Sequence, residues 1–178
     1  MSTTCNLTAA IALDCLDAIG GIKTLWVSSD FDYTTFTAGA TAGITALTGG
    51  TGTFYQIQVA KDVASFTETF NISNVNGTAF FTQEVTIPVQ HLSSAKRAQI
   101  QLLAYNRASR VVFEDNNGLY WIAGLTRGCV VSAGTSTTGT APGDFTGYNG
   151  LVLQGMEPAM TFQVSTLASL TGTTFTDA

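Results

Sequence analysis

The strongest structural signal in the sequence is a pair of alternating runs, residues 65–72 and 79–90, on either side of an Asn-Gly turn. Asn-Gly is a strong hairpin signal because both residues tolerate positive φ angles. The second run places four large apolar side chains on one face: Phe81, Val85, Ile87 and Val89. At roughly 3.3 Å per residue this strand is about 40 Å long, well beyond the usual length of about five or six residues. The sequence therefore predicts one long hairpin with an apolar face and a polar face.

One charged residue breaks the pattern of this hairpin. In the first run Phe66, Phe70 and Ile72 share the apolar face, and Glu68 falls among them. A carboxylate is costly on an apolar face unless it has partners. Glu68 therefore indicates either a different register for residues 65–72 or a position where the charge has a function.

A single helical pattern follows the hairpin directly, at residues 93–104. Ser93 or Ser94 can cap its N-terminus. Apolar residues at helical spacing predict one buried stripe, made of Leu92, Ala95, Ile100, Leu102 and Leu103.

Four basic residues lie in or just after this helix: Lys96, Arg97, Arg107 and Arg110. They are interpreted either as a solvated helix face or as partners for acidic residues of a neighbouring subunit. Nucleic-acid binding is disfavoured because no aromatic residues that could stack on bases are interleaved with them.

The rest of the chain predicts further strands and no second domain. Strand patterns cover residues 22–37, 54–60, 111–124 (a second Asn-Gly hairpin), 127–132, 145–156 and 159–166. Residues 38–53 predict a loop with at most a short strand, and residues 134–144 a turn-rich loop. We expect a single domain over residues 1–178, with an N-terminal arm or short helix at 1–21 and a loose C-terminal tail at 167–178. The predicted fold class is mainly β, a β-sandwich or barrel with one flanking α-helix.

The composition favours a subunit of an assembly. Only 11% of the 178 residues are charged while 45% are apolar, and a typical globular chain is about one quarter charged. No run approaches the roughly 20 apolar residues of a membrane span, and the start lacks the basic region of a signal peptide. A surface covered by assembly best explains so little charge. The net charge of −5 makes phosphate binding an unlikely default function.

No pattern in the sequence predicts catalysis, a metal site or a cofactor. His91 is the only histidine and follows a predicted strand, and no G-x-S-x-G motif supplies a serine nucleophile. Two acidic pairs, Asp30 with Asp32 and Glu114 with Asp115, lack the spacing of a dedicated Ca²⁺ loop.

Two other residue types leave alternatives open. Cys5, Cys15 and Cys129 form no C-x-x-C pair and are interpreted as free thiols, with a Cys5–Cys15 bridge or a metal site as alternatives. Tyr120 and Trp121 could stack on a sugar, although in an alternating strand one of them should face the core. A glycan-binding module is therefore one alternative function.

The order of these segments resembles the major tail tube proteins of tailed bacteriophages. The resemblance covers roughly residues 20–165. It rests on GGIK with a following strand, SFTETF, NGTAFFTQEVTI, SSAKRAQIQLLA, VVFEDNNGLYWIAG, and a TGTAPGD segment followed by GY and LQGMEP. Each motif is short, and their shared order carries the resemblance.

The resemblance implies a structural virion protein without enzymatic activity. Long hairpins of neighbouring subunits would join in a ring, hexameric in such proteins, and the rings would stack into a tube for genome ejection. The implied partners are further copies of this chain and other phage tail proteins, with DNA passing through without specific binding. The implied location is the virion tail, assembled in the cytoplasm of the host bacterium, with no role for a membrane.

On this interpretation the polar face of the hairpin and of the strand before it lines the lumen. Its residues are Gln56, Gln58, Thr67, Thr69, Thr82, Glu84 and Thr86. The apolar face would pack on the sandwich, the helix would support the hairpin from outside, and the basic residues would contact an adjacent subunit. Another virion component of similar fold, such as a tail terminator, a head–tail connector or a capsid decoration protein, is the main alternative.

Overall fold

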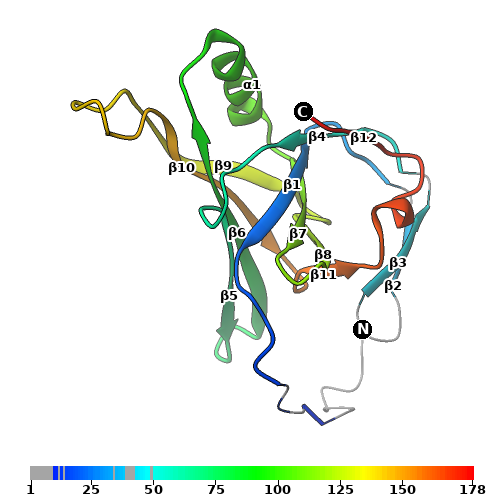
Figure 1. Ribbon diagram of the computed structural model, residues 1–178. Coiled ribbons are helices and arrows are strands. Elements are labelled where there is room, and N and C mark those ends of the chain that lie inside the picture. The colour runs from blue at the N-terminus through cyan, green and yellow to red at the C-terminus, as the bar shows by residue number, and fades with distance from the viewer. Residues whose placement is uncertain (1–9, 12, 14, 34, 39–42, 49) are drawn as a thin grey trace.

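A computed structural model describes residues 10–11, 13, 15–33, 35–38, 43–48 and 50–178. Its strands form two sheets, and one α-helix lies at one end (Figure 1). The prediction of a mainly β fold with one helix is confirmed. No helix among the described residues is long and apolar enough to cross a membrane.

The smaller sheet contains the predicted long hairpin. Its four antiparallel strands have the order β5-β6-β10-β9. They are β5 (Ser65–Ser73), β6 (Thr78–Gln90), β9 (Cys129–Thr137) and β10 (Gly147–Glu157). The hairpin pairs without a break from Ser65 opposite Thr86 to Ser73 opposite Thr78. Gly77 in the turn has a φ of 62°, the left-handed conformation that the Asn-Gly signal predicts.

The larger sheet has eight strands in the order β12-β4-β1-β7-β8-β11-β3-β2. They are β1 (Ile22–Ser28), β2 (Thr35–Ala38), β3 (Gly43–Thr48), β4 (Thr53–Ile57), β7 (Arg110–Asp115), β8 (Tyr120–Ala123), β11 (Phe162–Val164) and β12 (Thr174–Thr176). The sheet curls from β4 and β12 at the top of Figure 1 through β8 and β11 to β2 and β3 at the right. The predicted run 22–37 is thus divided into β1 and β2, and the predicted loop 38–53 holds β3.

Two apolar clusters lie on opposite faces of the larger sheet. The first joins the two sheets and includes Leu25 and Val27 of β1 with Val85 and Ile87 of β6. The second, which includes Trp26 of β1, lies on the other face. From Leu25 onward β1 is therefore buried on both faces, which explains why Leu25, Trp26 and Val27 form a continuous apolar run and do not alternate with polar residues.

The helix α1 (Ser94–Tyr105) begins where the sequence predicts, with the Ser93 side chain accepting a hydrogen bond from the backbone N–H of Lys96. The predicted buried stripe is wrong in part. Only Ile100 and Leu103 pack on the first cluster, whereas Leu92, Ala95 and Leu102 are exposed. The reason is the position of α1 at the end of the smaller sheet, where the core meets little of the helix (Figure 1).

The C-terminal tail, expected to be loose, is an ordered part of the larger sheet. A short 3-10 helix, η1 (Leu167–Ser169), precedes β12, which pairs in parallel with β4. The ring of Phe175 stacks on that of Phe54, with the ring centres 5.1 Å apart, and Trp26 donates a hydrogen bond from Nε1 to Asp177. The tail thus adds three apolar side chains to the second cluster: Leu167, Leu170 and Phe175.

Two other boundaries differ from the sequence prediction. The predicted loop 134–144 begins with strand, because β9 continues to Thr137 opposite β10. At the N-terminus, the described residues between 10 and 20 form neither helix nor strand, which leaves the arm as the better of the two alternatives; residues 1–9 lie outside the described part.

Candidate functional site

The outer face of the hairpin is polar, as its alternation predicts. Thr67 lies opposite Glu84, and Thr69 opposite Thr82, so these four side chains share one side of the sheet with Thr86. The inner side carries the buried Val85 and Ile87. Glu84 also accepts a hydrogen bond from Nε2 of Gln154 on β10. On the same side of β10, Val152 lies opposite Thr86 and Met156 opposite Thr82, so only the Glu84–Gln154 pair extends the polar face onto that strand.

The two glutamines assigned to the same face lie elsewhere. Gln56 is part of β4 in the larger sheet, and Gln58 follows that strand directly. Both side chains hold the C-terminal residue: Gln56 Oε1 accepts from the N–H of Ala178, and Gln58 Nε2 donates to its carbonyl oxygen. Two strands with the same alternation need not belong to the same sheet. The sequence prediction placed these glutamines on one polar face with the hairpin, whereas the structure places them in the other sheet.

Both outer strands of the smaller sheet have a free edge in the single chain. Among the described residues β5 pairs only with β6. Strand β9 pairs with β10 and, on its other side, only through its first residue, Cys129, which bridges to Ser109; each strand is nine residues long. The second half of β9, residues 132–137, is exposed apart from its pairing. A free edge presents unpaired backbone N–H and C=O groups that can pair with another chain. The sheet therefore has one docking edge at each end.

None of the four strands of this sheet contains a lysine or an arginine. Their charged residues are three glutamates: Glu68, Glu84 and Glu157. Glu84 points to the outer face, whereas Glu157 is buried and accepts hydrogen bonds from the backbone N–H groups of residues 126–128. The outer face consequently has no group that binds phosphate through charge.

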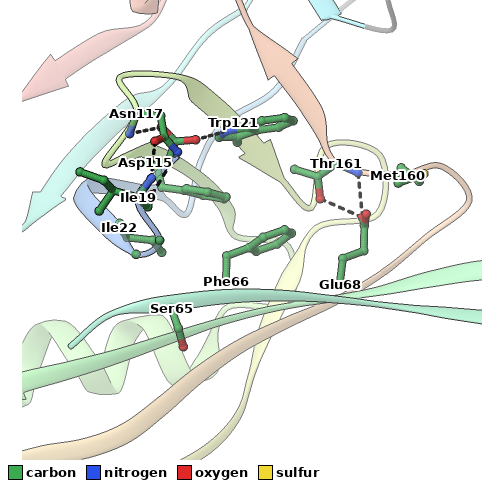
Figure 2. A pocket seen from close by; sticks show the side chains of 13 residues that line it. Ile19, Ile22, Ser65, Phe66, Glu68, Asp115, Asn117, Trp121, Met160 and Thr161 are labelled. Carbon is green, nitrogen blue, oxygen red and sulfur yellow. Dashed lines mark hydrogen bonds between the residues drawn. The ribbon is translucent and has the colours of Figure 1, made fainter. Parts of the chain in front are cut away.

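Glu68 is on the apolar side of β5 because a polar network holds it there. Its Oε1 accepts hydrogen bonds from the backbone N–H and the hydroxyl of Thr161, at 2.8 and 2.9 Å (Figure 2), and from Nε2 of Gln83 at 3.0 Å. Gln83, which is buried, also accepts from the N–H of Gly124. The register of residues 65–72 was correct, and the glutamate ties the hairpin to the segments that precede β9 and β11.

The four basic residues do not form one cluster. Lys96 donates from Nζ to the backbone oxygen of Gln90, and Arg97 and Arg107 are exposed. Arg110 begins β7 and is half-buried; its Nη1 donates to the carbonyl of Ala108, while its buried Nε has no partner. Within the described ranges the four make no ion pair, and Lys23 pairs with Glu114 instead.

The remaining candidates for chemistry are isolated. His91 lies at the exposed corner between β6 and α1 with a φ of 63°, and its backbone N–H donates to the backbone carbonyl oxygen of Thr146. Cys15 is an exposed free thiol and Cys129 a buried one, whose pKa burial raises to about 12; Cys5 lies outside the described residues. In the part of the chain that the structure describes, no three His, Cys, Asp or Glu side chains gather into a metal site.

Tyr120 and Trp121 belong to the two separate clusters and do not form a sugar-binding platform. Tyr120 packs on the second cluster near Trp26, with ring centres 6.5 Å apart. Trp121 packs on the first cluster and donates from Nε1 to Asp115 (Figure 2). The two rings therefore lie on opposite faces of β8 and do not form one shared flat surface, and Trp121 lines a cleft.

A cleft of about 460 Å³ opens between the start of β5 and the β7–β8 hairpin (Figure 2). Its apolar lining includes Phe66, Phe113, Trp121 and Met160. The carboxylates of Glu68 and Asp115 also line it, but both already accept hydrogen bonds from this chain. The surface left for an occupant is therefore mainly apolar.

Sequence reasoning did not identify the large apolar side chains that are exposed in the single chain, which are candidates for a contact surface. At the far end of the hairpin Phe70, Ile72 and Val75 are 56%, 69% and 96% exposed. On α1, Leu102 and Tyr105 are exposed as well. Their sequence signal is identical to that of core residues, because alternation and helical spacing mark any buried face, including one that is buried only by another subunit.

No protein-family model, curated protein or solved structure matches this chain.

Proposed function

We propose that this protein is a structural subunit that joins with copies of itself into rings, and that the rings stack into the tail tube of a bacteriophage. The observation that carries the proposal is the four-stranded sheet with a free edge at each end. Pairing β5 of one copy with β9 of the next extends the sheet from subunit to subunit. Closure into a ring then leaves no edge exposed.

The two faces of this sheet support a ring in which the polar outer face of the hairpin points to the channel. Its inner face is already packed on the larger sheet through Val85, Ile87 and Leu153. The outer face is the only one that can line a shared channel, and it carries Thr67, Thr69 and Glu84. A wall without lysine or arginine releases no counterions from DNA, so a duplex could slide along it without adhesion.

The exposed apolar side chains support assembly independently of the edges. Single exposed apolar residues are ordinary on soluble proteins, but contiguous patches mark contact surfaces. Phe70, Ile72 and Val75 gather at the end of the hairpin, away from the core. Contacts between stacked rings would bury them, and Arg97 and Arg107 would then face acidic residues of a neighbour.

Backbone hydrogen exchange tests the edge pairing without any substitution. We expect the amides of β5 and β9 that face the free edges to exchange fast in dispersed protein and to become protected on assembly. Strand β7 is the internal control, because it is paired on both sides and its protection should not change. Assembled protein in which β5 and β9 still exchange as they do when dispersed would refute the proposed ring.

A further inference from the structure

The described part of the N-terminal arm carries large apolar side chains that are almost fully exposed. Ile11, Leu13 and Leu16 are each at least 92% exposed. Three such residues within six positions are more than the scattered exposed leucine that any soluble protein carries. A segment of this kind is stable in water only where another surface covers it.

The base of this arm is fixed to the domain. The N–H of Ile19 donates to Oδ1 of Asn117 at 2.8 Å, and Nδ2 of Asn117 donates back to the carbonyl of Ile19 at 3.1 Å. Asn116 adds a bond from Nδ2 to the carbonyl of Gly20. These bonds fix the start of the arm beside the turn between β7 and β8. Figure 2 shows Ile19 beside Asn117 at the rim of the cleft.

The arm and the cleft have matching chemistry. Ile19 and Ile22 form part of the cleft wall. Farther along the arm Ile11, Leu13 and Leu16 are exposed and are not among the residues that line the cleft. The carboxylates at its edge are occupied by Thr161, Trp121 and backbone N–H groups, so the open wall is formed by aromatic rings and Met160. Such a wall favours an aliphatic occupant.

We infer that the cleft of each copy receives the apolar N-terminal arm of a second copy. Every copy then offers one arm and one cleft. Within the proposed rings each arm enters the cleft of the next copy in the same sense, so the contact is head-to-tail, in contrast to a reciprocal exchange of arms that would close a dimer. It links copies into a continuing series, in a ring or along an axis. The contact adds to the edge pairing proposed above. Both involve the start of β5, but the cleft uses side chains such as Phe66, whereas edge pairing uses the backbone N–H and C=O groups of the strand.

Cross-linking through the exposed Cys15 tests this contact in the full chain. The Met160→Cys variant, with Cys5→Ser to remove the other N-terminal thiol, is treated with a short bismaleimide. Cys129 is buried and stays unmodified. We expect a ladder of covalent dimers and larger species on a denaturing gel, because each arm joins a different cleft.

Two controls decide whether the ladder reports the inferred contact. Met156→Cys has nearly the same exposure as Met160, 49% against 50%, but lies on β10 outside the cleft, and should give no ladder. Adding Leu13→Asp and Leu16→Asp to the Met160→Cys chain should remove the ladder. A ladder that persists in either control refutes the contact, as does cross-linking within single chains or none at all.

The result is separable from the test of the tube. If tubes form but no cross-linked ladder is seen, the ring proposal stands and the arm contact is refuted. If a ladder is seen in protein that never forms rings or tubes, the arm contact stands and the ring proposal is refuted.

Discussion

Replacing Phe54 with alanine is expected to lower the free energy of unfolding by about 3–5 kcal/mol. Phe54 is fully buried, and its ring lies 5.1 Å from the rings of both Phe31 and Phe175. The substitution removes the centre of the second apolar cluster and the surface on which the C-terminal tail docks. Urea unfolding of dispersed protein, followed by tryptophan fluorescence, measures the change.

The neighbouring residue supplies the matched control. Tyr55 is in the same strand but is 56% exposed, and Tyr55→Ala should change the stability by no more than about 0.5 kcal/mol. If the two substitutions cost equal and small amounts, the second cluster is not a packed core and β12 is not held as described.

Lysine at two positions on the outer face of the hairpin is expected to turn a non-adhesive tube into one that binds DNA. Thr67 and Glu84 lie opposite each other there, and Thr67→Lys with Glu84→Lys puts positive charge where the proposed channel has none. Repeated around a ring, these charges should bind a duplex tightly at ~50 mM salt, with an affinity that falls by roughly 10³–10⁵ at ~200 mM. Co-sedimentation of assembled tubes with linear DNA measures the binding.

The prediction is that DNA binding depends on where the lysines lie, on the channel face, and not only on the added charge. Asp62→Lys with Thr126→Lys makes the same change of charge on exposed loops outside the sheet and gives the background binding. Equal binding by the two double variants would show that Thr67 and Glu84 do not line the channel. Failure of the first variant to assemble would instead place them in a packed interface.

The hairpin and the helix could be predicted because their signals are local. Alternation and the Asn-Gly turn fix the pairing of β5 with β6, and a serine cap fixes the start of α1. The C-terminal strand could not be predicted in this way. Its three residues pair with residues 53–55 of β4, more than a hundred positions earlier, and nothing in the tail alone indicates that partnership.

The sequence also did not show which strands belong to the same sheet. Strands β4 and β5 alternate alike and are separated by a short loop, yet they belong to different sheets. Gln56 and Gln58 were therefore assigned to the wrong face. Glu68 shows the opposite case, because its place on the apolar side was correctly identified from alternation while its partners, Gln83 and Thr161, could be found only in the folded chain.

Apolar patterning also does not distinguish a core from an interface. Phe66 and Phe70 occupy equivalent positions on β5, but Phe66 packs on Phe113 whereas Phe70 is 56% exposed beyond the end of the core. The same holds for Leu103 and Leu102 on α1. The distinction depends on how far the larger sheet extends beneath each element, which is a property of the whole fold.

Negative-stain electron microscopy of the purified protein across a concentration series tests the central claim most directly. A chain whose sheet edges pair between copies should form hollow rings at low concentration and stacked tubes of uniform width as the concentration rises. Rings that never stack would favour a terminator or connector over a tube subunit. Particles that remain single at every concentration would contradict assembly through the edges of β5 and β9.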